Sequence, residues 1–292
     1  MGQKSEIFFS TGCLQGQTDE RVQSLVRNGI TSVELSGGPP VADPERFFQS
    51  LPDNLNVQLH NYFPPPLTPF VMNLCSPDQG IRDSSRQLAR SAIQRTSDLG
   101  KKFYSLHAGF TADPVVADLG KTWSVRGTQL SMAEATAIFV REVTALANFA
   151  ERLGVRLLVE NNVLTAEMRD QFGLELLMMS TAGQIDETMQ ALDGACDLLL
   201  DAAHFQISCY ATGVAVDEQF ADLGTRPRAW HLSSNDGLAD QNCALSGNEW
   251  FWRYIDSSAQ FVTLEVRCTA EEARQQISLT ESVLAQETRY DS

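Results

Sequence analysis

Four apolar stretches in the second half of the chain each end in an acidic residue or a histidine. They occupy residues 157–159, 198–200, 229–230 and 261–264, and they end in Glu160, Asp201, His231 and Glu265. A carboxylate inside a buried strand would lack partners, whereas at the end of the strand it can face a pocket. In an α/β barrel, side chains at the C-terminal ends of different strands converge on one site. The pattern therefore favours a barrel with an oxygen-rich metal site.

Strand-like stretches alternate with helical ones along the whole chain, without a linker or a break in composition. The expected strands lie at residues 7–10, 33–35, 57–60, 103–106, 155–159, 197–200, 228–232 and 260–266. This alternation predicts a parallel sheet, and eight units in one domain favour a closed (β/α)8 TIM barrel, a fold that takes about 250 residues. We therefore expect an α/β fold with one barrel domain over residues 1–292.

Helix signals fill the gaps between the expected strands. The expected helices lie at residues 18–28, 44–50, 79–99, 131–153, 173–180, 184–192, 217–223 and 271–286. Ser131 followed by Glu134 is a capping-box pattern, so the fourth helix should begin there. Residues 109–130 are expected to form a long loop, and loops of that length in a compact domain are usually functional or mobile.

Composition excludes several classes of protein. The formal net charge of −15, without a Lys/Arg cluster, opposes binding to nucleic acid or to an anionic membrane surface. No apolar run approaches the roughly 18 residues needed to span a membrane, and the first residues do not resemble a secretory signal. The six cysteines show no C-x-x-C spacing and are read as reduced thiols. We therefore expect a cytoplasmic protein, and whether it is a homo-oligomer is left open.

The chain contains only four histidines, and all of them fall at or just after the C-terminal end of an expected strand. They are His60, His107, His204 and His231. Scattered core or surface histidines would not be placed in this way. Taken singly, His60 and His107 could equally be hydrogen-bonded residues at the top of the barrel.

The three carboxylates and the histidine at the ends of the last four strands would need a counter-charge. Carboxylates held close together repel one another unless a cation intervenes, and a divalent metal is the simplest such partner. Three carboxylates and one imidazole suit Mn²⁺, Mg²⁺ or Co²⁺ better than a tetrahedral zinc site. The alternative from the residues alone is a salt-bridge network with Arg228 or Arg267.

The motifs at the strand ends carry a family resemblance that covers nearly the whole chain. L-L-V-E-N-N, L-L-L-D-A-A-H, W-H-L-S-S-N-D and T-L-E-V together resemble the xylose isomerase-like TIM barrel superfamily, and particularly its sugar phosphate isomerase/epimerase branch. The resemblance implies a metal held by Glu160, Asp201, His231 and Glu265. In ketose 3-epimerases of this group the two metal-bound glutamates, here Glu160 and Glu265, also exchange the substrate proton. The residue matching their substrate-contacting histidine is His204.

Two departures from the family patterns bear on the substrate. The epimerases carry an arginine a few residues after the histidine of the seventh strand, which is His231 here. This chain has Gly237 in place of that arginine. The superfamily also includes apurinic-site endonucleases, which bind a cluster of three zinc ions. In this chain, His60, His107 and His204 resemble the additional ligands of that cluster. An Asp-x-His pair of that cluster corresponds to Asp240-Gln241-Asn242, with asparagine in place of histidine. The resemblance therefore disfavours a nuclease but leaves a second metal open.

The sequence favours a metal-dependent isomerase or epimerase of a sugar or sugar-like polyol, acting by proton transfer through an enediolate. The expected cofactor is one divalent ion (Mn, Co, Mg or Zn), with room for a second, and the expected partner is a small-molecule sugar. Further residues expected to bind substrate or a second metal are His60, His107, His204, Glu34, Trp123, Tyr62 and Phe63. The alternatives are a metal-dependent lyase or dehydratase on a keto-sugar, an apurinic-site endonuclease-like phosphodiesterase, and a sugar-binding barrel without activity.

Overall fold

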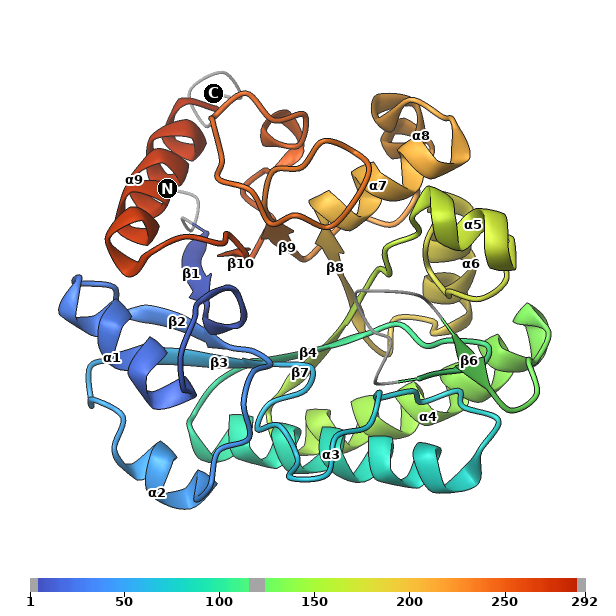
Figure 1. The fold of residues 1–292 in the computed structure, drawn as a ribbon, viewed down its shortest axis with the longest axis horizontal. Helices are drawn as coiled ribbons and strands as arrows, with labels where there is room; N and C mark the ends of the chain where they lie inside the picture. Colours follow the sequence, from blue (N-terminus) through green and yellow to red (C-terminus); the bar gives the residue numbers. More distant parts are fainter. Residues whose placement is uncertain (1–4, 116–123, 288–292) are drawn as a thin grey trace.

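Eight parallel strands close into a barrel in the order β1-β10-β9-β8-β7-β4-β3-β2 (Figure 1). The computed structural model describes residues 5–115 and 124–287. The barrel strands are β1 (Glu6–Ser10), β2 (Ser32–Leu35), β3 (Asn56–His60), β4 (Phe103–His107), β7 (Arg156–Glu160), β8 (Asp197–Asp201), β9 (Ala229–Leu232) and β10 (Phe261–Leu264). The expected (β/α)8 barrel is confirmed, with each strand within two residues of its expected position.

Helices surround the barrel on its outside (Figure 1). They are α1 (Thr18–Arg27), α2 (Pro44–Gln49), α3 (Gln79–Asp98), α4 (Met132–Arg152), α5 (Ala166–Phe172), α6 (Ala182–Ala191), α7 (Ala202–Thr212), α8 (Val216–Asp222) and α9 (Ala270–Glu287), with short 3-10 turns η1 (Thr11–Cys13) and η3 (Trp252–Tyr254). The capping box at the start of α4 is confirmed, because Ser131 and Glu134 each bond to the other's backbone. Within the described residues, no helix is both long and apolar enough to cross a membrane.

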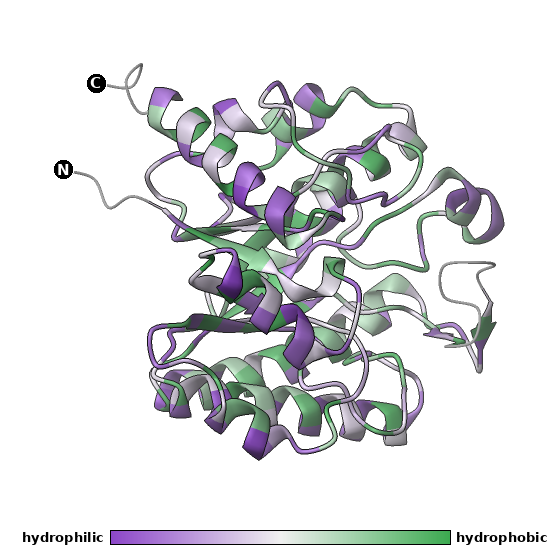
Figure 2. Ribbon diagram, turned by 60° about the vertical axis from the view of Figure 1, so that its left-hand side comes forward, coloured by the Kyte–Doolittle hydropathy of each residue, from purple (hydrophilic) through white to green (hydrophobic). Residues whose placement is uncertain are grey.

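The outer faces of the strands pack against amphipathic helices. In α4 the buried residues Phe139, Val143, Leu146 and Ala150 recur every three or four positions and form one face. Figure 2 shows the corresponding mixture of hydrophobic and hydrophilic residues along the outer helices. This packing fixes each strand from outside and leaves its inward residues free to build the interior of the barrel.

The interior of the barrel is divided into two levels by the period-two alternation of the strands. We define the apolar layer as the separate buried cluster of Phe8, Leu158, Leu199, Ala229 and Phe261. Two residues further along the same strands lies the polar layer, formed by Ser10, Glu160, Asp201, His231 and Thr263, all of them buried. Both layers face the same side of the sheet, and the polar layer lies nearer the C-terminal ends.

One expected helix, at residues 173–180, is wrong. The chain instead forms α5 just before it, where the Thr165 side chain accepts a hydrogen bond from the Met168 backbone and starts the helix. Gly173 then ends α5 with a φ of 69°, and Met179 has a φ of 56°. Residues with positive φ cannot belong to a right-handed α-helix, so the apolar stretch between Gly173 and Met179 runs as loop.

Helix α7 was not expected from the sequence. Most of its residues are buried, so it lacks the polar face that makes a helical period visible. It starts where the Asp201 carboxylate accepts a hydrogen bond from the His204 backbone, and it ends at left-handed Gly213. The segment after β8 therefore joins the end of a barrel strand directly to a buried helix.

The expected loop at residues 109–130 contains a short antiparallel pairing. Strands β5 (Asp113–Pro114) and β6 (Val125–Arg126) bond to each other outside the barrel. Each strand is only two residues long, too short for a period-two pattern to be recognised. Trp123 lies outside the described residues.

Candidate metal centre and active site

Glu160 lies at the centre of a cluster of four imidazoles. Its Oε2 atom is 3.3 Å from His60 Nε2 and 3.8 Å from His107 Nε2. Its Oε1 atom is 3.6 Å from His204 Nδ1 and 3.5 Å from His231 Nδ1. The side chain comes from the last residue of β7 and is fully buried. The barrel thus brings all the histidines of the chain to one carboxylate.

His231 connects Glu160 to a buried polar network around Glu34. Its Nε2 atom is 3.2 Å from Glu34 Oε2, and both side chains are fully buried. The same Glu34 oxygen accepts hydrogen bonds from Gln58 Nε2 at 2.7 Å and from Thr263 Oγ1 at 3.0 Å. Glu34 therefore fixes the orientation of the His231 ring, as a carboxylate does for many metal-binding histidines.

Asp201 and His204 are held in place by the start of α7. One carboxylate oxygen of Asp201 accepts the His204 backbone N–H at 2.8 Å, and the other lies 3.7 Å from His204 Nε2. His204 Nδ1 is 3.0 Å from the carbonyl oxygen of Asn161, the residue after Glu160. The Asn161 side chain in turn accepts the Asp201 N–H at 2.7 Å. The ends of β7 and β8 are therefore tied together.

Glu265 approaches the cluster from the end of β10. Its backbone N–H donates to Leu232 O at 3.0 Å, which extends the pairing of β10 with β9 by one residue. Its Oε1 atom is 3.7 Å from His231 Nδ1, and its side chain is 16% exposed. Glu160 and Glu265 thus meet the same ring nitrogen from two different strands.

The two glutamates that face His231 Nδ1, Glu160 and Glu265, have pKa values shifted in opposite directions. Burial raises the pKa of Glu160, but the surrounding imidazoles, His107 foremost, outweigh burial and hold it well below its usual range. Burial raises the pKa of Glu265 to about 8, with nearby carboxylates adding to the rise and His231 opposing it. Burial also raises the pKa of Asp201 to about 6, against the charge of His204. Opposed shifts of this kind are typical of sites that move protons.

The pKa values of the four histidines are also shifted in opposite directions, two downward and two upward. Burial lowers the pKa of His60, and it lowers the pKa of His107 to about 4, which favours the neutral form of each ring. For His204 and His231, burial is outweighed by the adjacent carboxylates, which raise the pKa of each ring well above its usual range. Binding of a cation at the centre would displace those protons, because metal ligands must be deprotonated.

The residues present fit a divalent cation. Among the described residues, both carboxylate oxygens of Glu160 and the Nδ1 atom of His231 are buried without a hydrogen-bond partner. Such buried atoms are rare unless a ligand or ion satisfies them. Ligand atoms of Asp201, His231 and Glu265 lie within 4.8 Å of one another, as do those of Glu160, Asp201 and His204. Their mixture of carboxylate and imidazole donors suits a divalent transition metal.

A second group of ligand atoms shares Glu160 with the first. His60, His107 and Glu160 also place donor atoms within 4.8 Å of one another. His60 Nδ1 is 2.8 Å from Ser105 Oγ, which leaves Nε2 facing Glu160. The arrangement has the donors for a second cation beside the first.

The alternative salt-bridge network with arginine is not formed by the described residues. Arg228 lies near Asp197 at the other end of the barrel, with Nε 4.0 Å from Oδ2. Arg267 is exposed, and the ion pairs of Glu160, Asp201 and Glu265 within the described chain are all with histidines. The cluster therefore lacks a permanent cationic side chain.

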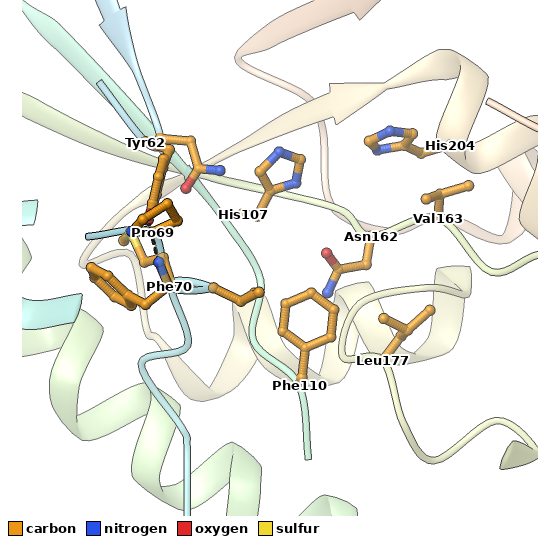
Figure 3. A pocket seen from close by; sticks show the side chains of 12 residues that line it. Tyr62, Pro69, Phe70, His107, Phe110, Asn162, Val163, Leu177 and His204 are labelled. Carbon is orange, nitrogen blue, oxygen red and sulfur yellow. Dashed lines mark hydrogen bonds between the residues drawn. The ribbon is translucent and has the colours of Figure 1, made fainter. Parts of the chain in front are cut away.

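Several expected pocket residues take different places in the structure. Glu34 is fully buried against His231 rather than lining an open cavity, and Phe63 is fully buried against Phe47 and Phe48. Tyr62 does line a cavity beside the centre. The cavity holds about 370 Å³ and shares His107 and His204 with the metal cluster (Figure 3).

Asp240 belongs to the site although it was not among the expected site residues. Its Oδ2 atom is 3.7 Å from His204 Nε2, and Oδ1 accepts a hydrogen bond from Asn242 at 3.2 Å. The signal in the sequence was the Asp240-Gln241-Asn242 stretch, but it lies in a loop, far from any apolar run that would have marked its position. Gly237 has a φ of 83°, and a Cβ there would lie 3.2 Å from the Tyr210 ring, so a larger residue at this position would strain the backbone and crowd that ring.

The fold and the cluster at its C-terminal end define a (β/α)8 barrel with a carboxylate–histidine centre. Residues 22–259 match the family described as xylose isomerase-like TIM barrel, and the chain belongs to that family. The comparison with curated proteins gives no match.

Solved structures share this fold at low sequence identity. A D-tagatose 3-epimerase-like protein is 14% identical with a TM-score of 0.71, covering 98% of this chain and 100% of its own. An L-ribulose 3-epimerase is 15% identical with a TM-score of 0.67, covering 99% and 98%. The TTHB071 protein of Thermus thermophilus, soaked with ZnCl2, is 18% identical with a TM-score of 0.64, covering 97% and 99%.

Proposed function

We propose that the protein is a divalent-metal-dependent isomerase or epimerase of a sugar or sugar-like polyol. The observation that carries the proposal is the pair Glu160 and Glu265, whose Oε1 atoms lie 3.5 Å and 3.7 Å from His231 Nδ1. Two carboxylates from different strands can reach opposite sides of a substrate bound between them. Such a pair suits the removal and return of one proton.

The relatives support the class of substrate and the need for a metal. Two neighbours with the same fold are named as a D-tagatose 3-epimerase-like protein and an L-ribulose 3-epimerase. Another was soaked with ZnCl2. The donor atoms in this chain agree with that chemistry, because buried atoms of Glu160 and His231 lack hydrogen-bond partners among the described residues.

Glu160, Asp201, His231 and Glu265 would hold the metal, and His60 and His107 would hold a second one together with Glu160. A bound divalent ion supplies Lewis-acid polarisation of a substrate carbonyl. Glu34 orients His231 through the 3.2 Å contact to Nε2, so the ring presents Nδ1 to the centre. That contact makes Glu34 a positioning residue rather than a ligand for substrate.

The proton transfer is the work of the two glutamates. One carboxylate removes the proton from the carbon next to the carbonyl, which leaves the sugar as an enediolate. The other carboxylate returns a proton to the opposite face for epimerisation, or to the neighbouring carbon for isomerisation. His204 lines the cavity as well as the centre and would hydrogen-bond a substrate oxygen through Nε2, since Nδ1 is engaged with Asn161 O.

The test is turnover of a ketose and aldose panel in deuterated water with the metal-loaded protein. We expect the parent to give products of unchanged composition with one deuterium on the α-carbon. Glu160→Gln and Glu265→Gln should each lose about 10²–10⁴-fold in turnover, the usual contribution of a positioned acid or base. Glu218→Gln, on the exposed face of α8, is the matched control and should retain the parental rate.

The outcomes separate the competing reactions. A product lighter by one water would assign a lyase or dehydratase. Cleavage of an abasic DNA duplex by the metal-loaded protein would restore the nuclease alternative. If both glutamine variants keep near-parental rates at full metal occupancy, the two-glutamate mechanism is wrong.

A further inference from the structure

The cavity beside the metal centre has one polar end and a long apolar wall. His107 and His204 form the polar end, which it shares with the cluster around Glu160 (Figure 3). The rest of the wall includes Phe70, Val71, Met72, Phe110 and Leu177. Its volume of about 370 Å³ is large enough for a small ligand, whose pockets usually hold about 300–1,000 Å³.

Two polar side chains beside the apolar wall, Tyr62 and Asn162, hydrogen-bond to the protein backbone. The Tyr62 hydroxyl accepts a hydrogen bond from the Phe70 N–H at 2.8 Å (Figure 3). The Asn162 amide nitrogen donates to three carbonyl oxygens, those of Ala108, Gly109 and Met178, at 3.0–3.1 Å. These bonds hold the walls together and engage the Asn162 amide nitrogen, so that donor is not offered to the hydroxyls of a second sugar unit.

Charge also restricts what the cavity can accept. Among the lining residues that the structure describes, there is no lysine or arginine. The adjacent cluster is rich in carboxylates, and the formal net charge of the chain is −15. A phosphate group placed against Phe70, Val71 and Met72 would lose its hydration without gaining a counter-charge, which is strongly unfavourable. The described lining therefore disfavours a phosphate group against this wall.

We infer that the substrate is an uncharged sugar carrying an apolar substituent, such as an aryl, alkyl or acyl group. The substituent occupies the wall formed by Phe70, Val71, Met72, Phe110 and Leu177 while the sugar ring meets the metal centre past His107 and His204. This inference rests on the proposed function and names its substrate class. Burial of a remote apolar group supplies binding energy that can position the reacting carbon.

The first experiment compares three probes that share one sugar. 6-O-phenyl-D-fructose, 6-O-methyl-D-fructose and D-fructose 6-phosphate, which keep the ketone and carry the substituent on the same carbon, are titrated calorimetrically into the metal-loaded protein. We expect the phenyl compound to bind at least tenfold more tightly than the methyl compound, and the phosphate to bind no more tightly than the methyl compound. Equal affinity of phenyl and methyl compounds, preference for the phosphate, or no saturable binding of the phenyl compound would each overturn the inference.

The second experiment places a charge on the apolar wall without touching the metal cluster. Val71→Asp should remove the preference for the phenyl compound, because its carboxylate would face the substituent. Leu67→Asp is the matched control, since Leu67 lies on the same loop, is 78% exposed and does not line the cavity. Phe70→Ala gives a milder change and should reduce the preference severalfold if Val71→Asp does not fold. An unchanged preference in a folded Val71 or Phe70 variant contradicts the assignment.

The proposed function and the substrate class fail in different ways. If the phenyl compound binds selectively but no sugar exchanges a proton with solvent, the function fails and the cavity assignment stands. If free or phosphorylated sugars are isomerised with no gain from an apolar substituent, the function stands and the cavity assignment fails.

Discussion

The two ends of β8 carry the same residue type in opposite settings. At its N-terminal end, Asp197 is partly exposed and forms a two-pronged ion pair with Arg156, with N···O distances of 2.7 Å and 2.8 Å. At its C-terminal end, Asp201 is buried, accepts the His204 backbone N–H and lies among imidazoles and other carboxylates, without an arginine or lysine partner among the described residues. The first carboxylate is satisfied by the protein itself, whereas the second has capacity left for a cation.

The same contrast extends across the barrel interior. The apolar layer buries Phe261 and its neighbours without a polar side chain, whereas the polar layer two residues further on concentrates carboxylates and histidines. Burying apolar surface stabilises a fold, and burying incompletely paired charge opposes it. We therefore expect the apolar layer to set the stability of the barrel and the polar layer to set its metal chemistry.

The largest expected change in stability follows from removal of an aromatic ring from the apolar layer. Phe261 is 2% exposed and contacts the Phe8 ring edge-on, with centroids 5.8 Å apart. Phe261→Ala should lower the free energy of unfolding by about 3–5 kcal/mol, measured by urea denaturation. Leu238→Ala, at a side chain 54% exposed, should change it by less than about 0.5 kcal/mol. A Phe261→Ala protein as stable as the parent would contradict the role given to the apolar layer.

The next effect concerns metal affinity at the two ends of β8. Asp201→Ala should weaken divalent-metal binding at least 100-fold, the upper limit of what loss of an outer-shell partner costs. Asp197→Ala removes the same group from the same strand and should leave affinity unchanged, as measured by calorimetric titration. Asp201→Asn retains the acceptor that caps α7, so it separates loss of the cap from loss of the ligand. Equal affinity in Asp201→Ala and Asp197→Ala would move the metal site elsewhere.

Removal of the metal should lower the free energy of unfolding, because the ion is expected to bind only to the residues of the polar layer in the folded state. When free metal exceeds its dissociation constant 100-fold, binding to the folded state adds about 2.7 kcal/mol. Chelator-stripped protein should therefore unfold at lower urea than protein reloaded with Mn²⁺, Co²⁺, Mg²⁺ or Zn²⁺, whichever binds. Glu218→Gln should keep this gain, and Asp201→Ala should lose it. A gain of the same size in Asp201→Ala would show that the ion binds outside the centre.

The smallest expected effect comes from a carboxylate of the helical shell. Glu142 in α4 accepts from Arg86 Nε at 2.7 Å, and its side chain is 8% exposed. Burial raises the pKa of Glu142, but Arg86 and Arg141 outweigh burial and lower it. A lowered folded-state pKa gives stabilisation that is complete above the unfolded value of about 4.3 and is lost as pH falls through the folded value.

Glu142→Gln should therefore cost about 1 kcal/mol of unfolding free energy at pH 7. The unfolding free energies of parent and variant should converge as the solution is acidified below the folded-state pKa. Urea denaturation across the pH range measures this convergence. A difference that stays constant with pH would show that packing rather than charge pairing makes the contribution. Unlike the carboxylates of the polar layer, Glu142 should show no dependence on metal.

The sequence by itself determined the barrel and the residues at its strand ends. Apolar runs that end in Glu160, Asp201 and Glu265 are local signals, because a strand and its polar last residue lie together in the chain. The capping box of Ser131 and Glu134 is local for the same reason. The convergence of these residues followed from the topology, since parallel strands of a closed barrel end on one face.

Tertiary structure decided which partners each of these side chains contacts. Glu34 and His231 are far apart in sequence, and only the register of the barrel strands brings Oε2 within 3.2 Å of Nε2. Helix α7 left no visible period because the fold buries nearly all of its sides. The cavity joins His107, at the end of β4, to Val71 and Leu177 from two separate connections, and no local pattern marks such a surface. Packing between distant segments has no signature in either segment alone, because its free energy exists only once both are in place.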